Sequence, residues 1–415
     1  MMFETKLKKL HVSIAGRGVG MLARESQYTF AYTRDDPGQL PVSLLMPASK
    51  LVYSDGDVFP CMDMNLPEGY LFQRILELSP KAPPTKMHLL ALAGGRAIGR
   101  VGFAVEFDDL AQAPIKPTSK QEILASTNSD DLFEQLLRYY LPTGAGISGV
   151  QPKVMVPSRA KLPTPDLIVK ADGAAYPGLS ANEFLCMTAA KAAGINTAEC
   201  DLSVDGKILV VDRFDVTNEG RRLGFEDIAA LMGRRVHDRL SNRKYEGSYE
   251  LVAQALNYFQ PSDASVLSSF FEQVAFSVMV RNGDAHLKNF GLLYDMGGDA
   301  KLAPMYDVVT TAIYEHERPG GELVRDRTLA LKLNKSKAYP TTDELLEFGK
   351  NHCRVERPHE ILEKIAEGMS KAISSSDERI PEETKRAMLE FWKVGQEYAM
   401  EAARKARSPS KRKPR

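Results

Sequence analysis

The sequence predicts an α+β protein with a β-rich N-terminal part and a large helical C-terminal part. Short runs typical of strands dominate residues 10–104 and are separated by turns rich in Gly, Pro and Asp. From residue 225 onward, apolar residues recur at the spacing of amphipathic helices. The 415 residues, 43% of them hydrophobic and 26% charged, suffice for roughly two to four folding units. This composition excludes collagen-like, disulfide-scaffold and wholly disordered proteins.

Membrane and secretory classes are not expected. No run approaches the roughly 18–20 apolar residues of a membrane helix, and the first residues lack a signal peptide's apolar core and cleavage site. We therefore expect a cytoplasmic protein with no membrane partner. The four cysteines have no CxxC spacing and no histidine at a metal-ligand interval, so we expect neither a disulfide framework nor a structural zinc site.

The chain has 54 basic and 54 acidic residues, but its C-terminal end is strongly basic. Residues 404–415 contain seven Lys or Arg and no acid, with prolines at 409 and 414. We expect this tail to be disordered. Two roles stay open for it: a solvated tail that aids solubility, or a contact with nucleic acid or an acidic partner.

In the N-terminal part, strand-like runs occur at His11–Ile14, Tyr28–Tyr32, Val58-Phe59 and Ile98–Ala104, and a helix is predicted over Leu71–Leu78. Gly16-Arg-Gly-Val-Gly20 resembles a dinucleotide loop. A strand-like run rather than a helix follows it, so a β-turn is favoured. Residues 112–120, with two prolines, form a linker.

After the linker, the pattern predicts a helix over residues 121–140, a Gly/Ser loop over 142–149, and strands over Lys153–Val156 and Asp166–Lys170. A helix over Ser180–Ala193 has Ser180 as its N-cap candidate and Glu183 in a capping-box position. Asp205-Gly206 then predicts a hairpin between residues 199–204 and 207–214.

The second half is predicted to be helical around one irregular island, residues 281–309. The expected helices cover residues 225–232, 248–259, 263–280, 342–352, 358–373 and 383–403.

The island carries the residues with the strongest chemical signal. Phosphoryl transfer to a hydroxyl needs a carboxylate at the nucleophile and oxygen ligands for Mg²⁺. Asp284, Asn289 and Asp307 supply that set, and the Asp284-to-Asn289 interval equals that of the protein-kinase catalytic loop. By itself this interval is also compatible with an ordinary loop that has no catalytic role.

The elements that precede the island stand in the order of a protein kinase. A Gly/Ser loop before a strand can fold over phosphates, and Lys170 can neutralise them. Glu183 on the following helix can orient Lys170 through an ion pair. Asp212-Arg213-Phe214 then leads into the helical half as an interlobe hinge. These features together predict a two-lobed, protein-kinase-like fold.

Six ordered motifs resemble those of HipA-type serine/threonine kinases, the toxins of bacterial toxin–antitoxin modules. They are Ile147-Ser-Gly-Val-Gln-Pro-Lys153, Ile168-Val-Lys170, Asn182-Glu-Phe-Leu-Cys-Met187, Asp212-Arg-Phe-Asp215, Asp284-Ala-His-Leu-Lys-Asn289 and Ala303-Pro-Met-Tyr-Asp307. The β-rich start, with Asn65-Leu-Pro-Glu-Gly69, is similar to that family's N-terminal subdomain.

The resemblance implies a division of the chain into four parts. These are an N-terminal β-rich subdomain (1–115), an N-lobe-like region with nucleotide loop, lysine strand and hinge (116–215), a helical C-lobe with the catalytic and metal-binding loops (216–403), and the basic tail (404–415).

The resemblance also implies roles for individual residues, with ATP and Mg²⁺ as cofactors. Asp284 would be the catalytic base, Lys170 would contact the ATP phosphates, and Asn289 and Asp307 would bind the metal. The full nucleotide-binding set would be Ser148, Gly149, Val150, Gln151, Pro152, Lys153, Lys170, Asp212, Arg213, Phe214, His286, Leu287, Lys288, Asn289, Tyr306 and Asp307.

As a member of this family the protein would arrest growth by phosphorylating an essential cytosolic protein, such as an aminoacyl-tRNA synthetase. It would also co-repress its operon with a HipB-like helix-turn-helix antitoxin bound to operator DNA. One departure concerns regulation. The serine that family members autophosphorylate lies two residues before Ser148, where this chain has Gly146. Ser148 is an alternative acceptor, or else a loop serine bonded to its own backbone.

Two other functions stay open at this stage. A kinase-fold co-repressor or binding protein would bind nucleotide without transferring phosphate, and a small-molecule kinase would phosphorylate a hydroxylated metabolite. Direct DNA contact, if present, is expected from the antitoxin partner and from basic surface such as Lys332, Lys335, Lys337 or the tail.

Overall fold

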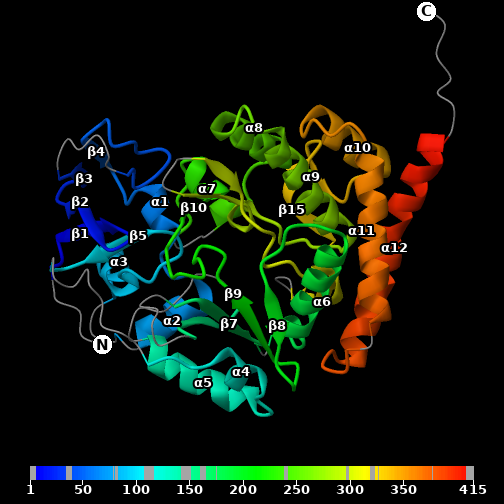
Figure 1. Cartoon of the computed structure of the whole chain (residues 1–415), viewed down its shortest axis with the longest axis horizontal. Coiled ribbons are helices and arrows are strands. Elements are labelled where there is room, and N and C mark those ends of the chain that lie inside the picture. Colours follow the sequence, from blue (N-terminus) through cyan, green and yellow to red (C-terminus); the bar gives the residue numbers. More distant parts are fainter. Residues whose placement is uncertain are drawn as a thin grey trace, which may run out of the picture. The chain divides into compact units, whose positions relative to one another are not determined.

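The computed structural model describes residues 6–33, 40–77, 79, 83–106, 116–141, 151–158, 165–173, 175–237, 242–295, 299–317, 323–325, 327–375 and 377–407 (Figure 1). The chain forms two compact units, each built from several chain segments. Unit 1 comprises Met1–Ser180, Glu199–Lys244 and Phe290–Ala303. Unit 2 comprises Ala181–Ala198, Tyr245–Asn289 and Pro304–Arg415.

Unit 1 begins with a five-stranded antiparallel sheet in the order β4-β3-β2-β1-β5. Its strands are β1 (Lys9–Ile14), β2 (Arg17–Arg24), β3 (Tyr28–Tyr32), β4 (Val52–Asp55) and β5 (Val101–Ala104). Ala15 and Gly16 have positive φ and make the turn between β1 and β2. The predicted β-turn is therefore confirmed, whereas β2, which starts within the Gly16–Gly20 run, was not predicted.

Three short helices follow in the same unit: α1 (Pro60–Asp63), α2 (Gly69–Glu77) and α3 (Lys86–Ala93). The strand-like pair Val58-Phe59 is not a strand. Phe59 is the N-cap of α1 and Pro60 its first residue, a position that suits proline because its missing N–H would have no helical partner there.

A second antiparallel sheet of unit 1 has the order β6-β7-β9-β8. It consists of β6 (Lys153–Val156), β7 (Leu167–Ala171), β8 (Cys200–Leu202) and β9 (Ile208–Asp212), which confirms the predicted strands and hairpin. Helices α4 (Lys120–Leu124) and α5 (Ser129–Tyr140) lie beside this sheet (Figure 1). They replace the single helix predicted over 121–140, because Ser119 and Glu122 cap α4 separately and residues 126–128 interrupt the helix.

The third sheet of unit 1, in the order β10-β11-β12, corrects another prediction. It contains β10 (Gly224–Asp227), β11 (Gly291–Tyr294) and β12 (Ala300–Leu302). Residues 225–232 are therefore not one helix. Phe225 and Glu226 pair with β11, and the Asp227 side chain caps the short helix α7 (Ile228–Leu231). A short apolar run fits a strand as well as a helix, and the distant partner strand decides.

Unit 2 is mainly helical, as predicted. Its helices are α6 (Leu179–Ala192, which starts in unit 1), α8 (Tyr249–Phe259), α9 (Ala264–Met279), α10 (Thr342–Asn351), α11 (Pro358–Ser374) and α12 (Glu382–Arg407). Two hairpins were not predicted: β13 (Glu315–Glu317) with β14 (Leu323–Arg325), and β15 (Thr328–Leu333) with β16 (Ser336–Ala338). In the part of the chain described, no helix combines the length and the apolar character needed to cross a membrane.

Two helix ends differ from the prediction. Ser180 lies inside α6, where its hydroxyl donates to the Lys207 carbonyl at 3.0 Å, so it is not the N-cap. Residues 404–407 are helical rather than a disordered tail. Lys405 holds this last turn through ion pairs with Asp343 on α10 and Glu401 one turn earlier. Residues 408–415 lie outside the described residues.

A fully buried ion pair fastens the segments of unit 1 together. Arg213 binds both carboxylate oxygens of Asp215, at 3.0 and 2.6 Å, and the two side chains are 0% and 1% exposed. The same guanidinium donates to the carbonyls of Arg96, Ala97 and Pro165. Asp215 also accepts the Gly99 amide N–H at 2.7 Å.

A second buried arginine extends this network. Arg222 donates to the carbonyls of Gly95, Ala97, Gly99 and Val101, so that the stretch before β5 is held by two guanidinium groups. Burial and the neighbouring charge of Arg213 lower the pKa of Arg222. The guanidinium nevertheless stays protonated at neutral pH, because arginine does not deprotonate in proteins and four carbonyls accept from it.

We predict that Asp215→Ala lowers the free energy of unfolding by about 3–5 kcal/mol, since it leaves the Arg213 charge buried without its anion. Denaturant unfolding of the purified chain measures this change. Lys207→Ala is the matched control, because its pair with Asp130 is exposed and such pairs contribute little. Equal effects of the two substitutions would contradict the assignment.

Candidate functional site

The loop after α9 is held by hydrogen bonds from turns and side chains rather than by those of a helix or a sheet. Arg281 has positive φ, which turns the chain out of the helix. The Asn282 amide donates to the Ser277 carbonyl at 2.8 Å, and the Asn282 side chain accepts the Asp284 N–H at 3.0 Å. The backbone of Asp284 is thereby fixed while its side chain stays partly exposed.

The Asp284 carboxylate has a defined partner in the same unit. The Tyr245 hydroxyl donates to Asp284 Oδ1 at 2.8 Å. The Tyr245 ring also packs edge-on against the imidazole of His286, with 5.1 Å between ring centroids. Sequence reasoning missed Tyr245, because it lies 39 residues before Asp284 and belongs to no motif.

Residues 287–289 form a single 3-10 turn that ends on Asn289. The His286 N–H donates to Asn289 Oδ1 at 3.0 Å, and the Asn289 N–H returns a bond to the His286 carbonyl. An amide oxygen has two lone pairs, so Asn289 Oδ1 keeps one for a cation. Leu287, which was predicted to line the nucleotide site, is fully buried and packs in the core.

Residues close to Asp307 in the sequence connect its segment to this loop by hydrogen bonds. It has positive φ and a partly exposed side chain. The adjacent Tyr306 hydroxyl donates to the Lys288 carbonyl at 2.6 Å. Four residues after Asp307, the Thr311 hydroxyl accepts the Gly283 N–H at 2.7 Å and donates to the Arg281 carbonyl at 3.2 Å. The predicted base and metal-binding segments are therefore linked directly.

The segment after Asp307 is fastened in turn to two helices. The Asn182 side chain on α6 bonds both the N–H and the carbonyl of Thr310, at 2.8 and 3.1 Å. Trp392 on α12 is fully buried and donates its indole N–H to the Thr310 hydroxyl at 2.9 Å. Asn182 belongs to the motif Asn182–Met187, and its observed contacts give that motif a structural role.

The oxygen atoms on these loops fit Mg²⁺. A carboxylate from Asp307 and an amide oxygen from Asn289 are hard ligands, which Mg²⁺ uses together with phosphate oxygens and water. Among the described residues, no three His, Cys, Asp or Glu side chains form a metal-binding cluster.

Unit 1 contributes two lysines on one face of its second sheet. Lys153 on β6 is the direct cross-strand neighbour of Lys170 on β7, and both are buried, at 7% and 4% exposure. The pairing of β6 with β7 therefore places these two lysines side by side, and their binding of phosphate stays a prediction.

Only part of the predicted nucleotide loop can be placed. Ser148, Gly149 and Val150 lie outside the described residues. Gln151 donates to the Ala171 carbonyl at 3.2 Å, and the Pro152 carbonyl accepts the Ala171 N–H, so the end of the loop is tied to β7. Glu183 is buried on α6, and its pairing with Lys170 stays a prediction.

The predicted adenine hinge has a largely structural role. The Arg213 side chain belongs to the buried ion pair described above, and Asp212 pairs with Lys120 at 2.6 Å. The amide N–H groups of both residues are also taken, by the carbonyls of Asp166 and Glu199 respectively. Phe214 packs against Phe225, with 5.5 Å between ring centroids. A nucleotide base at this hinge would therefore use carbonyl groups rather than these two N–H groups.

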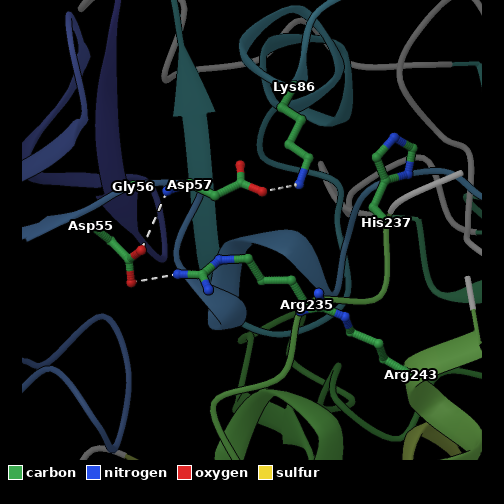
Figure 2. A pocket seen from close by; sticks show the side chains of 7 residues that line it. All are labelled: Asp55, Gly56, Asp57, Lys86, Arg235, His237 and Arg243. Carbon is green, nitrogen blue, oxygen red and sulfur yellow. Dashed lines mark hydrogen bonds and ion pairs between the residues drawn. The ribbon is translucent and has the colours of Figure 1, made fainter. Parts of the chain in front are cut away.

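Unit 1 also contains a hollow of about 430 Å³ that none of the predicted site residues lines. Figure 2 shows its walls: Asp55, Gly56, Asp57, Lys86, Arg235, His237 and Arg243. Arg235 pairs with Asp55, and Lys86 pairs with Asp57 at 2.8 Å. Beneath them, buried Asp63 accepts from Lys86 and from the amides of Val236 and His237. The opposite charges compensate one another, so the cluster fastens residues 235–237 to the N-terminal helices.

The ionisation of this cluster follows from its contacts. Burial alone would raise the pKa of Asp57, but the bond from Lys86 and the Val58 amide outweigh it and lower that pKa. Burial opposes the charge of Lys86, but Asp57 and Asp63 raise its pKa overall. For His237, burial dominates and lowers the pKa. His237 is therefore neutral at pH 7.

Family comparisons identify the two parts of the chain. Residues 145–375 match the HipA-like C-terminal domain, and residues 10–104 match the HipA N-terminal domain. The first match alone covers more than half of the chain and includes Lys170, Asp284, Asn289 and Asp307.

Relatives extend over most of the chain. Y4mE of Sinorhizobium fredii, whose name describes it as a kinase, is 26% identical over 75% of this chain and 80% of its own length. The serine/threonine-protein kinase toxin HipA of Shewanella oneidensis is 23% identical over 60% of this chain and 62% of its own. The fold matches a chain of the solved Shewanella oneidensis HipA, HipB and operator DNA complex, with TM-score 0.67, 18% identity, and coverage of 94% of this chain and 97% of that one.

We predict that acidification destabilises the protein partly through His237. Its pKa is lowered in the folded state, so below its ordinary pKa of about 6.5 the unfolded chain binds the proton more readily and stability falls. His237→Gln should give a shallower loss of Tm between pH 7 and pH 5.5 in calorimetry. An identical slope in both proteins would contradict this assignment.

Proposed function

Because the chain belongs to the HipA family, we propose that it is an ATP- and Mg²⁺-dependent serine/threonine protein kinase and the toxin of a toxin–antitoxin module. The observation that carries the proposal is the arrangement of three residues on two loops of unit 2. Asp284, Asn289 and Asp307 lie on loops joined by the Thr311 and Tyr306 bonds. Their spacing and residue types are those that phosphoryl transfer to a hydroxyl requires.

In this reaction Asp284 receives the proton of the substrate hydroxyl as that oxygen attacks the γ-phosphorus. The bond between the γ-phosphorus and the β,γ-bridging oxygen breaks, and ADP is the leaving group. Asn289 and Asp307 would hold Mg²⁺, which when bound would neutralise charge on the phosphates. Lys153 and Lys170 are the residues of unit 1 proposed to bind the phosphate groups of the nucleotide. The protein's own contribution is to position these groups, since most of the rate enhancement in phosphoryl transfer comes from positioning and electrostatics.

The partners proposed are a helix-turn-helix antitoxin and, through it, operator DNA. The support is the fold match to a chain of a complex that contains HipA, HipB and operator DNA. An essential cytosolic protein, such as an aminoacyl-tRNA synthetase, is the proposed substrate, on the family resemblance alone. Ser148 is the proposed autophosphorylation site, because position 146 is Gly in this chain and not the serine of other family members.

The specific variant Asp284→Asn should lower phosphate transfer by about 10²–10⁴-fold, the usual contribution of a positioned acid or base. The measurement is incorporation of γ-labelled phosphate from Mg²⁺–ATP, with mass mapping of the acceptor. Asp343→Asn, an exposed carboxylate on α10, is the control and should retain the wild-type rate. A wild-type rate in Asp284→Asn would exclude it as the base. Nucleotide binding without any transfer in the wild type would favour the co-repressor function instead.

Lys170→Met should weaken Mg²⁺–ADP binding by about tenfold or more, because a charge-assisted contact contributes about 1.5–3 kcal/mol. Titration calorimetry measures this affinity independently of catalysis. Lys207→Met is the control, as its side chain is half exposed and pairs with Asp130. Equal affinities of Lys170→Met and the wild type would remove Lys170 from the phosphate site.

A further inference from the structure

We propose that Tyr245 is a positioning residue for the reaction, and that its hydroxyl holds the Asp284 carboxylate in the orientation in which it accepts a proton. This inference rests on the proposed function, since it assigns Asp284 the role of base. No motif contains Tyr245, and the family resemblance gave it no role.

The geometry of the contact between Tyr245 and Asp284 supports this role. Tyr245 donates to Asp284 Oδ1 at 2.8 Å, a distance typical of a hydroxyl bonded to a carboxylate. A carboxylate has two oxygens. With Oδ1 held by Tyr245 and the Asp284 backbone N–H held by Asn282, the plane of the carboxylate is restricted and Oδ2 is the oxygen left to face the substrate hydroxyl.

The Tyr245 ring itself is held in place by a neighbouring ring. The edge of Tyr245 packs on His286, two residues after the base. Tyr245 and Asp284 both belong to unit 2, and the contact lies within that unit. The Tyr245 ring is therefore already restricted by its packing against His286. Forming the hydrogen bond to Asp284 thus costs little additional side-chain entropy.

The chain segment that contains Tyr245 contacts the loop of Asp284 at two points. Four residues after Tyr245, buried Tyr249 donates its hydroxyl to the Ala285 carbonyl at 3.0 Å. Tyr249 thus holds the backbone next to the base, while Tyr245 holds the carboxylate. Between them, Ser248 caps helix α8, which fixes the spacing of the two tyrosines.

The test is Tyr245→Phe, which removes only the hydroxyl and keeps the ring on His286. The expected result is a fall of about tenfold in the rate of label transfer from saturating Mg²⁺–ATP to dephosphorylated casein and to the chain itself. The KM for ATP and the Kd for Mg²⁺–ADP should stay within twofold of the wild type, because Tyr245 acts on the base and not on the nucleotide. Tyr258→Phe, on an α8 residue that is 76% exposed, is the matched control and should keep the wild-type rate.

A double variant separates positioning from general structural damage. If Tyr245 acts through Asp284, adding Tyr245→Phe to Asp284→Asn produces no further loss of rate. A further tenfold loss in that background would overturn the proposal, as it would show an effect that does not pass through the base. This comparison stays informative even if Tyr245→Phe lowers Tm.

Three other outcomes would also overturn it. An unchanged rate in Tyr245→Phe would show that the hydroxyl is dispensable. A faster rate would show that Tyr245 competes with the substrate hydroxyl for Asp284, and label mapped to Tyr245 would show that it is itself the acceptor. Failure of the proposed function is distinguishable from these, because the wild type would then transfer no label and would equal Asp284→Asn.

Discussion

The buried ion pair between Arg213 and Asp215 is the constraint on which unit 1 depends. Its guanidinium reaches carbonyls from the loop before β5 and from the entry to β7, so one side chain satisfies backbone groups of segments far apart in sequence. Such a pair is costly to bury and is favourable only when every polar atom is bonded. Here Gly99 and Asp215 complete the bonding. The sequence predicts a nucleotide hinge within the motif Asp212–Asp215. In the structure, Arg213 and Asp215 of this motif hold segments of unit 1 together.

The loops of unit 2 also need hydrogen-bond partners for their backbone polar groups. Residues 281–289 and 304–311 contain little regular structure, so their backbone groups need partners from side chains. Thr311, Tyr306, Asn182 and Asn282 provide them. The Thr311 and Tyr306 bonds tie the two irregular segments to each other, the Asn182 bond ties one of them to α6, and the Asn282 bond lies within a single loop. The result is that two carboxylates and an amide are held in place by polar side chains rather than by a sheet.

Charge is distributed differently in the two sites of unit 1. Lys153 and Lys170 are direct cross-strand neighbours, and phosphate binding is the role proposed for them above. In the hollow, Lys86 pairs with Asp57 and Arg235 pairs with Asp55. These two ion pairs fasten chain segments to one another.

The sequence by itself determined the features that depend on local pattern. The hairpin at Asp205-Gly206, strands β6 and β7, and the long helices of unit 2 follow from side-chain periodicity and turn residues, which neighbouring residues specify. The spacing of Asp284, Asn289 and Asp307 indicated phosphoryl transfer for the same reason.

Only the tertiary structure decided the features that need a distant partner. Residues 224–227 form a strand because β11 lies beside them, and no local pattern encodes that pairing. Arg213 is structural because its acceptors come from residues 96, 97 and 165. Tyr245 reaches Asp284 across 39 residues of sequence. Local periodicity carries no information about such contacts, since they arise when separate elements pack and bury their polar groups together.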